Sequence, residues 1–183
     1  QLKAVLVERA RVAREKARLA ELERQRLAKL KNKGKNTKPP VVVVDPGGGG
    51  GGGFRLLTPP GGYITSGFGM RFHPVLHIWK LHDGLDFGMP CGTPVYASAA
   101  GTVFKAGYSS TGWGNQIMID HGIQRGVGLV TTYNHLSQII VYGGGVARGQ
   151  LIGYSGTTGY STGCHLHLGV YVEGVPVNPL GWL

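Results

Sequence analysis

All seven histidines of this 183-residue chain lie between residues 73 and 167, and two of them stand two positions apart. In the stretch STGCHLHLGV, at 161–170, an extended backbone would place His165, His167 and Gly169 on one face of a strand. The opposite face would be apolar and would face the core, with Cys164, Leu166, Leu168 and Val170. A single histidine on a strand is most often structural, but two imidazoles on one face indicate a cleft that binds a metal or transfers protons.

A second group of possible metal ligands is in the stretch KLHDGLDFG, at 80–88, where three residues separate His82 from Asp86. Imidazole and carboxylate groups are common zinc ligands, and a catalytic zinc site typically has three protein ligands and an open position for water. His82, Asp86 and one histidine of the 165/167 pair would complete such a set. Cys164 is another possible ligand, but strand alternation turns it away from His165 and His167.

Few side chains in this region can transfer protons. The H-E-x-x-H motif of many zinc peptidases is absent, and Glu173 is the only glutamate after residue 53. The general base would therefore be a histidine or a spare aspartate, since imidazole titrates near neutral pH. His135, in the stretch TTYNHLS, would share a strand face with Tyr133 and is a third histidine to consider.

The elements that must position these residues are short and rich in β-branched and aromatic residues. Between about residue 54 and residue 183, runs such as GTPVYASAAGTVFKAG and NQIMIDHG are separated by glycines. No run of helical length there shows a 3.6-residue period. This pattern predicts a mainly β domain with antiparallel strands and tight turns.

Two further segments precede that domain. Residues 1–33 are rich in Ala, Leu, Arg, Lys and Glu and contain neither Gly nor Pro. Their 3–4 apolar spacing predicts an α-helix and indicates the end of a coiled coil that self-associates or binds a partner. A basic helix exposed to solvent is the alternative. Residues 34–53, with a Pro-Pro pair and seven consecutive glycines, predict a flexible linker.

The positive charge of the chain is concentrated near its start. Residues 1–38 contain 13 Lys and Arg against 4 Glu, whereas residues 39–183 contain 6 against 5 acidic residues. We expect no nucleic-acid binding by a nearly neutral domain, so a nucleic-acid binder would depend on the basic segment alone. No apolar run approaches the ~20 residues that span a bilayer, so we expect no transmembrane segment in this chain. Because it begins at Gln1, we expect a fragment or processed product, so the absence of a signal peptide or anchor from this sequence proves nothing.

Four stretches resemble, in order and spacing, the lysostaphin-like zinc metallopeptidases, which are β-sheet endopeptidases of bacterial peptidoglycan. They are LHDGLDF, GTPVYASAAGTV, TYNHLS and GQLIGYSGTTGYSTGCHLHLGV. The resemblance covers about residues 54–183 and implies an antiparallel β-sheet domain of the lysostaphin type. On the matching motifs it implies that His82, Asp86 and His167 bind one zinc ion, and that His135 and His165 are catalytic.

The resemblance therefore implies a secreted or surface-associated bacterial enzyme, outside the cytoplasm, that hydrolyses peptide cross-links of peptidoglycan. All five positions of the family's site are filled, which argues against a non-catalytic module that binds peptidoglycan or activates a separate hydrolase. The motifs leave open which peptide bond is cut. His77, Trp79 and Tyr133 are candidates for the groove that binds substrate, although aromatic residues are more often part of a core.

A disulfide follows from placing Asp86 and His167 at one metal. Cys91 and Cys164 are the only cysteines, and they lie five and three residues from those two ligands. We therefore expect them to be paired, which implies an oxidising location, and two buried thiols are the alternative.

Gly169 is a departure from the family pattern. After the H-x-H motif the family usually has an aromatic residue and a Glu, whereas this chain has Leu168 and Gly169. Because Gly169 shares the face of the histidines, we expect no carboxylate there to orient His167. Another group, such as a backbone carbonyl or a water molecule, would take its place.

Overall fold

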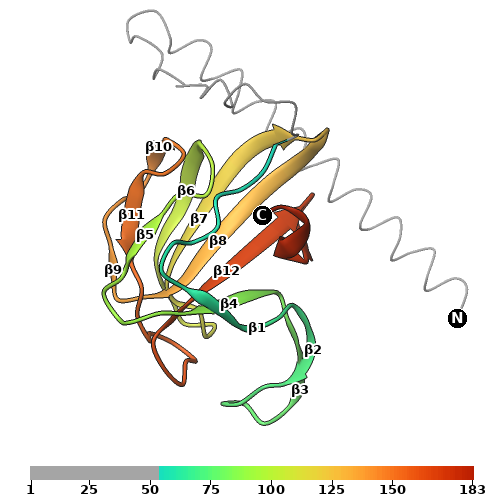
Figure 1. Cartoon of the computed structure of the whole chain (residues 1–183), viewed down its shortest axis with the longest axis vertical. Helices are drawn as coiled ribbons and strands as arrows, with labels where there is room; N and C mark the ends of the chain where they lie inside the picture. The colour runs from blue at the N-terminus through green and yellow to red at the C-terminus, as the bar shows by residue number, and fades with distance from the viewer. Residues whose placement is uncertain (1–53) are drawn as a thin grey trace, which may run out of the picture. The chain divides into compact units, whose positions relative to one another are not determined.

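Antiparallel strands form the structure, a computed structural model that describes residues 54–183 of the chain (Figure 1). The mainly β prediction for this region is confirmed. The helix predicted at 1–33 and the linker predicted at 34–53 lie outside the described residues.

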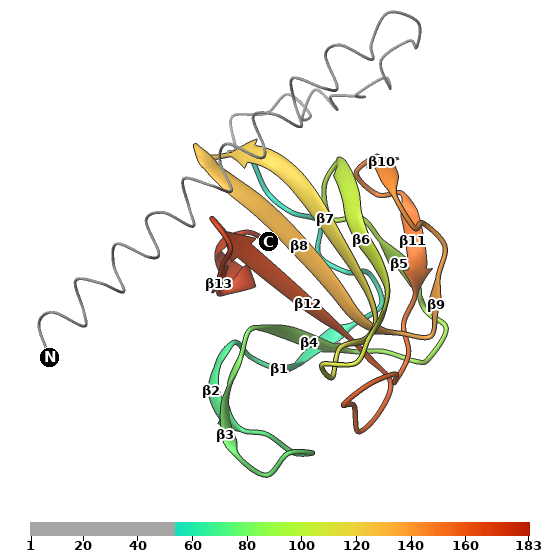
Figure 2. The same cartoon turned by 180° about the vertical axis from the view of Figure 1, so that it is seen from behind.

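The largest sheet has the strand order β1-β4-β12-β8-β7-β6-β10, and β13 pairs with the C-terminal half of β12. Its neighbouring strands are all antiparallel, and the long strands β7, β8 and β12 lie side by side in both views (Figures 1 and 2). The strands of this sheet are β1 (Tyr63–Ser66), β4 (Gly84–Gly88), β6 (Gly101–Ser109), β7 (Gly114–Gln124), β8 (Val127–Leu136), β10 (Gly144–Val146), β12 (His165–Val172) and β13 (Val175–Val177).

Two smaller sheets complete the described region. One has three strands, with β11 (Leu151–Tyr154) between β5 (Pro94–Tyr96) and β9 (Gln138–Ile139). The other is a hairpin of β2 (Gly69–Phe72) and β3 (Trp79–His82), which extends away from the main sheet (Figures 1 and 2). Because β3 ends at residue 82 and β4 begins at residue 84, the chain passes from the hairpin into the main sheet at Asp83.

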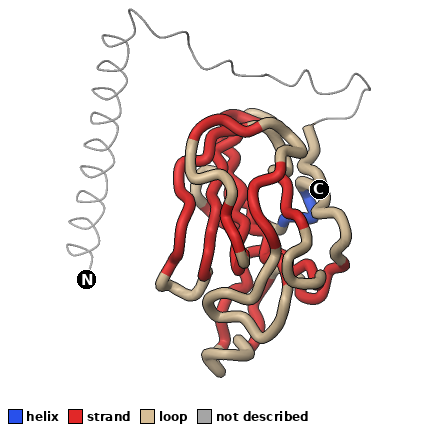
Figure 3. The backbone as a smooth tube through the Cα atoms, turned by 90° about the vertical axis from the view of Figure 1, so that its left-hand side faces the viewer, coloured by secondary structure: helices blue, strands red, loops and turns tan. Residues whose placement is uncertain are grey.

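Helix is nearly absent from the described residues. The one helical element there is a short 3₁₀ turn, η1 (Pro179–Gly181), close to the C-terminus (Figure 3). No helix within residues 54–183 is long and apolar enough to span a membrane.

The core lies where the main sheet meets the three-stranded sheet. It combines side chains from β4, β7, β8 and β12 with side chains from β5, β9 and β11, among them Phe87, Ile119, Val95, Ile139 and Ile152. On β12, alternation correctly predicted the buried face, since Leu166, Leu168 and Val170 are fully buried. The other face of β12 is therefore free to carry polar residues.

One irregularity of the main sheet changes the direction of His135. Between the cross-strand pairs Ile117↔Tyr133 and Asn115↔Leu136, one residue of β7 faces two residues of β8. This is a β-bulge, and His135 adopts a positive φ of 63° within it. Tyr133 is fully buried, whereas His135 lines a cleft, so the prediction that the two side chains share a face is wrong.

A disulfide between Cys91 and Cys164 joins the turn before β5 to the loop that leads into β12. The predicted pairing is therefore present, and the alternative of two buried thiols is wrong. One part of the prediction is also wrong, because Cys164 is exposed and does not lie on the core face. The strand begins at His165, so the alternation of β12 does not extend back to the cysteine.

Candidate metal centre

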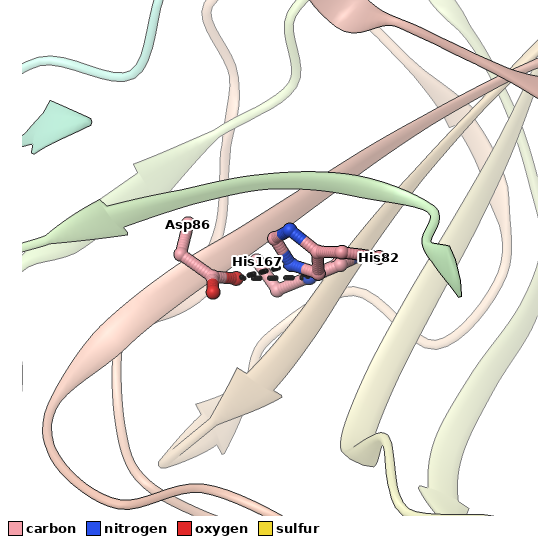
Figure 4. A group of neighbouring side chains, drawn as sticks. All are labelled: His82, Asp86 and His167. Atoms are coloured by element: carbon pink, nitrogen blue, oxygen red, sulfur yellow. Dashed lines mark hydrogen bonds and ion pairs between the residues drawn. The ribbon is translucent and has the colours of Figure 1, made fainter. Parts of the chain in front are cut away.

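Two of the predicted ligands are direct neighbours across the main sheet. His167 of β12 pairs with Asp86 of β4, so both side chains lie on the same side of the sheet. The Asp86 Oδ1 and His167 Nδ1 atoms are 3.0 Å apart (Figure 4). His167 is 2% exposed and Asp86 is 8% exposed, so the pair is shielded from solvent.

His82 brings a third donor atom from the β2–β3 hairpin. It is the last residue of β3, and its ring lies beside the His167 ring and the Asp86 carboxylate (Figure 4). Its Nε2 lies 3.0 Å from Asp86 Oδ1 and 3.0 Å from His167 Nδ1. The fold thus brings together the three residues predicted as zinc ligands, and all three are buried.

The hydrogen bonds of these imidazoles indicate which nitrogen atoms can bind a cation. His82 Nδ1 donates to the carbonyl oxygen of Gly67 at 2.6 Å, so Nε2 keeps its lone pair. His167 Nε2 faces the Asp83 carboxylate, which likewise leaves the lone pair on Nδ1. Two nitrogen lone pairs and Asp86 Oδ1 then converge at 3.0 Å from one another. Such a cluster of acceptors fits a cation, and two imidazoles with one carboxylate suit zinc with an open fourth position.

The second oxygen of Asp86 is held by Arg71 of β2. The Arg71 Nη2 atom donates to Asp86 Oδ2 at 3.2 Å, which leaves Oδ1 to His82 and His167. Burial raises the pKa of Asp86, but its contacts with His167 and His82 lower it more, so the net pKa is well below its ordinary value. Asp86 is therefore an anion at neutral pH, as a ligating carboxylate must be.

A carboxylate also lies behind His167, which the sequence analysis did not expect. Asp83 Oδ1 is 3.4 Å from His167 Nε2. Burial raises the pKa of Asp83, but its contact with His167 and its hydrogen bond from Tyr171 outweigh this effect and lower it. Burial lowers the pKa of His167, whereas its contacts with Asp83 and Asp86 raise it above the ordinary value. The expectation that no carboxylate lies near His167 is wrong, because the break between β3 and β4 places Asp83 there, in the position for which we expected another group such as a carbonyl or water.

Gly84 leaves the space that His167 occupies. It pairs with Gly169 between β4 and β12. A Cβ atom at this position would lie 2.4 Å from the Leu168 carbonyl oxygen and 2.5 Å from His167 Nε2, far inside van der Waals contact. Any larger residue would displace the β12 backbone or the imidazole, so the glycine of HDGLD is a packing requirement of the site.

The two histidines predicted as catalytic line the same cleft as the ligands. His135 Nδ1 donates to the Thr158 carbonyl oxygen at 2.7 Å, and His165 Nδ1 donates to the Gly163 carbonyl oxygen at 2.8 Å. Each ring is thus anchored through Nδ1 and has Nε2 available. The ring centroids are 4.7 Å apart, and His165 Nε2 lies 3.6 Å from Asp86 Oδ1. Burial lowers the pKa of His135 to about 4, so this ring is unprotonated at neutral pH.

Three segments form the walls of the cleft around these histidines. They are the β2–β3 hairpin, the loop between β6 and β7, and the loop before β12. Lys80 Nζ lies 5.9 Å from the centroid of the Trp113 ring, so two of the walls approach each other. The wall residues include Arg71, His73, Lys80, Thr111, Trp113, Tyr160 and Thr162.

The three residues predicted for the groove are not part of this lining. Tyr133 is fully buried, and its hydroxyl accepts a hydrogen bond from the Ser98 amide at 2.7 Å, so its prediction as a groove residue is wrong. His77 and Trp79 are exposed in the hairpin, but they do not line the cleft. Trp113, in the loop between β6 and β7, lines it instead.

The residues of the site lie in a region that a protein-family model recognises. The model described as Peptidase family M23 matches residues 80–179, which is more than half of the chain. The chain belongs to peptidase family M23. The matched region of this M23 chain includes all five site positions, namely His82, Asp86, His135, His165 and His167.

Curated relatives of the M23 chain are bacterial peptidases by name. Over 135 residues it is 44% identical to DD-carboxypeptidase/endopeptidase Mpg of Neisseria meningitidis serogroup B, a match that covers 69% of this chain and 30% of that protein. Over 119 residues it is 45% identical to peptidoglycan DD-endopeptidase ShyA of Vibrio cholerae, which covers 64% of this chain and 26% of that protein. The chain therefore spans less than a third of the length of these relatives.

Solved M23 structures share the fold. The catalytic domain of lysostaphin from Staphylococcus simulans matches with a TM-score of 0.57 and 36% identity, over 66% of this chain and 90% of that one. A zinc-containing peptidase from Vibrio cholerae matches with a TM-score of 0.60 and 36% identity, over 70% of this chain and 40% of that one. The predicted lysostaphin-like fold is confirmed for the described region.

Two polar residues of the M23 site were not identified from the sequence. Asp83 stands next to His82 in the motif itself, and a carboxylate beside a ligating histidine was a usable signal. Arg71 had no such signal, because its approach to Asp86 depends on the pairing of β2 with β3 and on the position of that hairpin.

Proposed function

We propose that this chain is a zinc-dependent endopeptidase that hydrolyses peptide cross-links of bacterial peptidoglycan. The observation that carries the proposal is the convergence of His82, Asp86 and His167 at 3.0 Å, in a cleft with two further anchored histidines. The names of two relatives, a DD-carboxypeptidase/endopeptidase and a peptidoglycan DD-endopeptidase, support the substrate class. A zinc-containing peptidase of the same fold supports the identity of the metal.

In this proposal His82, Asp86 and His167 hold one zinc ion. The bound ion would supply Lewis-acid chemistry, polarising the scissile carbonyl and lowering the pKa of a coordinated water molecule. The ligand set suits this task, because it contains one carboxylate and two neutral imidazoles and leaves the site with a net positive charge. Arg71 keeps the Asp86 carboxylate in the orientation that presents Oδ1.

His135 and His165 carry protons in this proposal. Peptide hydrolysis requires an acceptor for a proton of the attacking water and a donor to the leaving amine. We assign the acceptor role to His135 Nε2, because the low pKa of this imidazole keeps it unprotonated at neutral pH. His165 Nε2 lies 3.6 Å from Asp86 Oδ1 while its Nδ1 is anchored at Gly163, so we assign the donor role to it.

We further propose an extracytoplasmic location, secreted or associated with the cell surface. The disulfide supports it, because disulfides persist in oxidising compartments and peptidoglycan lies outside the cytoplasm. Self-association through residues 1–33, or binding of a coiled-coil partner there, stays a prediction.

Digestion of purified, cross-linked peptidoglycan tests the function. The zinc-loaded chain should convert cross-linked muropeptide dimers into monomers, with the mass of one water added and one free amine formed for each bond cut. Zinc-loaded His135→Ala should leave the dimers intact. A chain that binds zinc and the polymer but releases no such product is a non-catalytic binding module instead. Substrates with glycine cross-bridges and with direct cross-links, compared side by side, identify the bond.

A further inference from the structure

The contact between Asp83 and His167 has a feature that His82, His135 and His165 do not share. His82, His135 and His165 each donate one ring nitrogen to a backbone carbonyl oxygen. His167 Nε2 instead faces a carboxylate oxygen, Asp83 Oδ1, at 3.4 Å. We propose that Asp83, held in place by Tyr171, is a positioning residue that orients His167 toward the metal.

Burial makes this contact more than a surface ion pair. His167 Nε2 and Asp83 Oδ1 are both buried side-chain atoms, and within residues 54–183 neither has a regular hydrogen-bond partner. The distance of 3.4 Å exceeds the ordinary hydrogen-bond range, so we treat the contact as an electrostatic one between the ring N–H and the carboxylate, and not as a hydrogen bond. Because both atoms are buried, separating them would leave two polar groups unpaired, which is costly.

Tyr171 fixes the carboxylate from the other side. It lies on β12 four residues after His167, and its hydroxyl donates to Asp83 Oδ2 at 2.5 Å. The carboxylate is thus bridged between two side chains of the same strand, with one oxygen for each. A carboxylate held in this way restricts rotation of the His167 ring and increases the electron density on Nδ1, the nitrogen that faces Asp86.

Gly169 is the residue that makes this bridge possible. It lies between His167 and Tyr171 on the same face of β12. A Cβ atom there would lie 2.5 Å from Thr132 Oγ1 and 3.1 Å from Tyr171 Cε2. Any side chain at this position would displace Thr132 or the Tyr171 ring, and with the ring its hydroxyl. The absence of a side chain at residue 169 therefore leaves Tyr171 room to reach Asp83.

The inference rests on the metal site of the proposed function, so zinc affinity is the appropriate measurement. We would determine the zinc dissociation constant of the full chain by competition with a chromogenic chelator. Asp83→Asn should weaken binding by about 10- to 100-fold. Tyr171→Phe should weaken it by a smaller factor, about 3- to 10-fold, because the carboxylate stays but loses one charge-assisted bond. The double variant should bind no more weakly than Asp83→Asn alone, since the two residues act as one unit.

Matched controls separate positioning from general destabilisation. Asp120→Asn alters an exposed aspartate that accepts from the Gly122 amide, and Tyr142→Phe alters an exposed tyrosine. Both should leave zinc affinity unchanged. The visible absorption of the cobalt-substituted chain should change in Asp83→Asn and stay unchanged in Asp120→Asn, because it reports the geometry of the ligands.

Three results decide the inference. Weaker zinc binding and an altered cobalt spectrum, with metal-free melting temperatures near that of the parent, support it. Zinc dissociation constants within twofold of the parent for both Asp83→Asn and Tyr171→Phe overturn it. The inference is also overturned if zinc binding weakens only in variants whose melting temperature falls, while the cobalt spectrum stays unchanged. A parent chain that binds no zinc would instead contradict the proposed function itself.

Discussion

Asp86 and His167 are direct cross-strand partners in the main sheet, and their Oδ1 and Nδ1 atoms lie 3.0 Å apart. The next pair along the two strands, Leu85 and Leu168, is buried on the opposite face. A slip of one residue would exchange the two faces and bury a ligand in the core, so burial of the leucines also determines the position of the ligands. The hydrophobic packing of the domain and the assembly of its metal centre depend on the same strand register.

Removal of the His135 or His165 imidazole should strongly lower turnover but leave metal binding intact. His135→Ala and His165→Ala should each lower kcat by about 10²- to 10⁴-fold, the usual contribution of a general acid or base. Zinc content after gel filtration should stay at about one equivalent, since the ligand set remains. His77→Ala, which alters an exposed histidine away from the cleft, should be active. Near-normal turnover by zinc-loaded His135→Ala would contradict its assigned role.

Loss of the Tyr133 hydroxyl should affect stability and not substrate binding. Tyr133→Phe leaves the Ser98 amide without its partner in the core and should lower the free energy of unfolding by about 1–3 kcal/mol. The KM for peptidoglycan fragments should be unchanged, because the side chain does not line the cleft. Urea unfolding and steady-state kinetics measure the two quantities. A raised KM with unchanged stability would restore Tyr133 as a groove residue.

Removal of the disulfide should destabilise the folded protein, because the unfolded chain then gains conformational entropy. Cys91 and Cys164 are separated by 73 positions, and closing a loop of that length contributes about 4 kcal/mol on the chain-entropy model. The Cys91→Ser/Cys164→Ser variant should show a loss of that size in urea unfolding. The parent under reducing conditions is the matched control and should lose a similar amount. A change below about 1 kcal/mol in both would show that the bridge contributes little to stability.

His121 should contribute to acid destabilisation. Burial lowers the pKa of this histidine below its ordinary value of 6.5. As the pH falls below about 6.5, the unfolded chain takes up the proton before the folded protein does. The free energy of unfolding therefore decreases in this range, by at most about 1.4 kcal/mol per pH unit for this group, and levels off below the folded pKa.

His121→Gln removes this titration, so the variant should lose less stability than the parent between pH 7 and pH 5. Both proteins are compared in the presence of a chelator, so that release of metal does not contribute. His77→Gln, which alters an exposed histidine, should lose as much free energy of unfolding between pH 7 and pH 5 as the parent does. If the free energy of unfolding falls equally with pH in His121→Gln and in the parent, His121 does not contribute to acid destabilisation.

Alternation in the sequence predicted the part of the site that lies on a regular strand. His165 and His167 share a face of β12 because its other face is fully buried, which leaves no freedom in the strand's orientation. Motif resemblance then supplied His82 and Asp86, which the structure brings next to His167.

The errors occur where the regular pattern ends. An inserted residue in β8 reverses the direction of His135 relative to Tyr133, and such a bulge has no reliable signal in a single sequence. Cys164 lies one residue before β12, outside its alternation. Asp83 reaches His167 because the chain changes sheets at that residue, which is a property of the tertiary structure.

The most direct test of the proposed zinc-dependent activity is a titration of the metal-free chain with zinc, with cross-link cleavage of purified peptidoglycan as the readout. If one zinc ion binds at the three ligands, the cleavage rate should rise in proportion to added zinc and reach its maximum at one equivalent per chain. His167→Ala, which lacks one of the three converging donors, should stay inactive at that point. Cleavage that is independent of zinc, or equal in His167→Ala and the parent, would contradict the proposed activity.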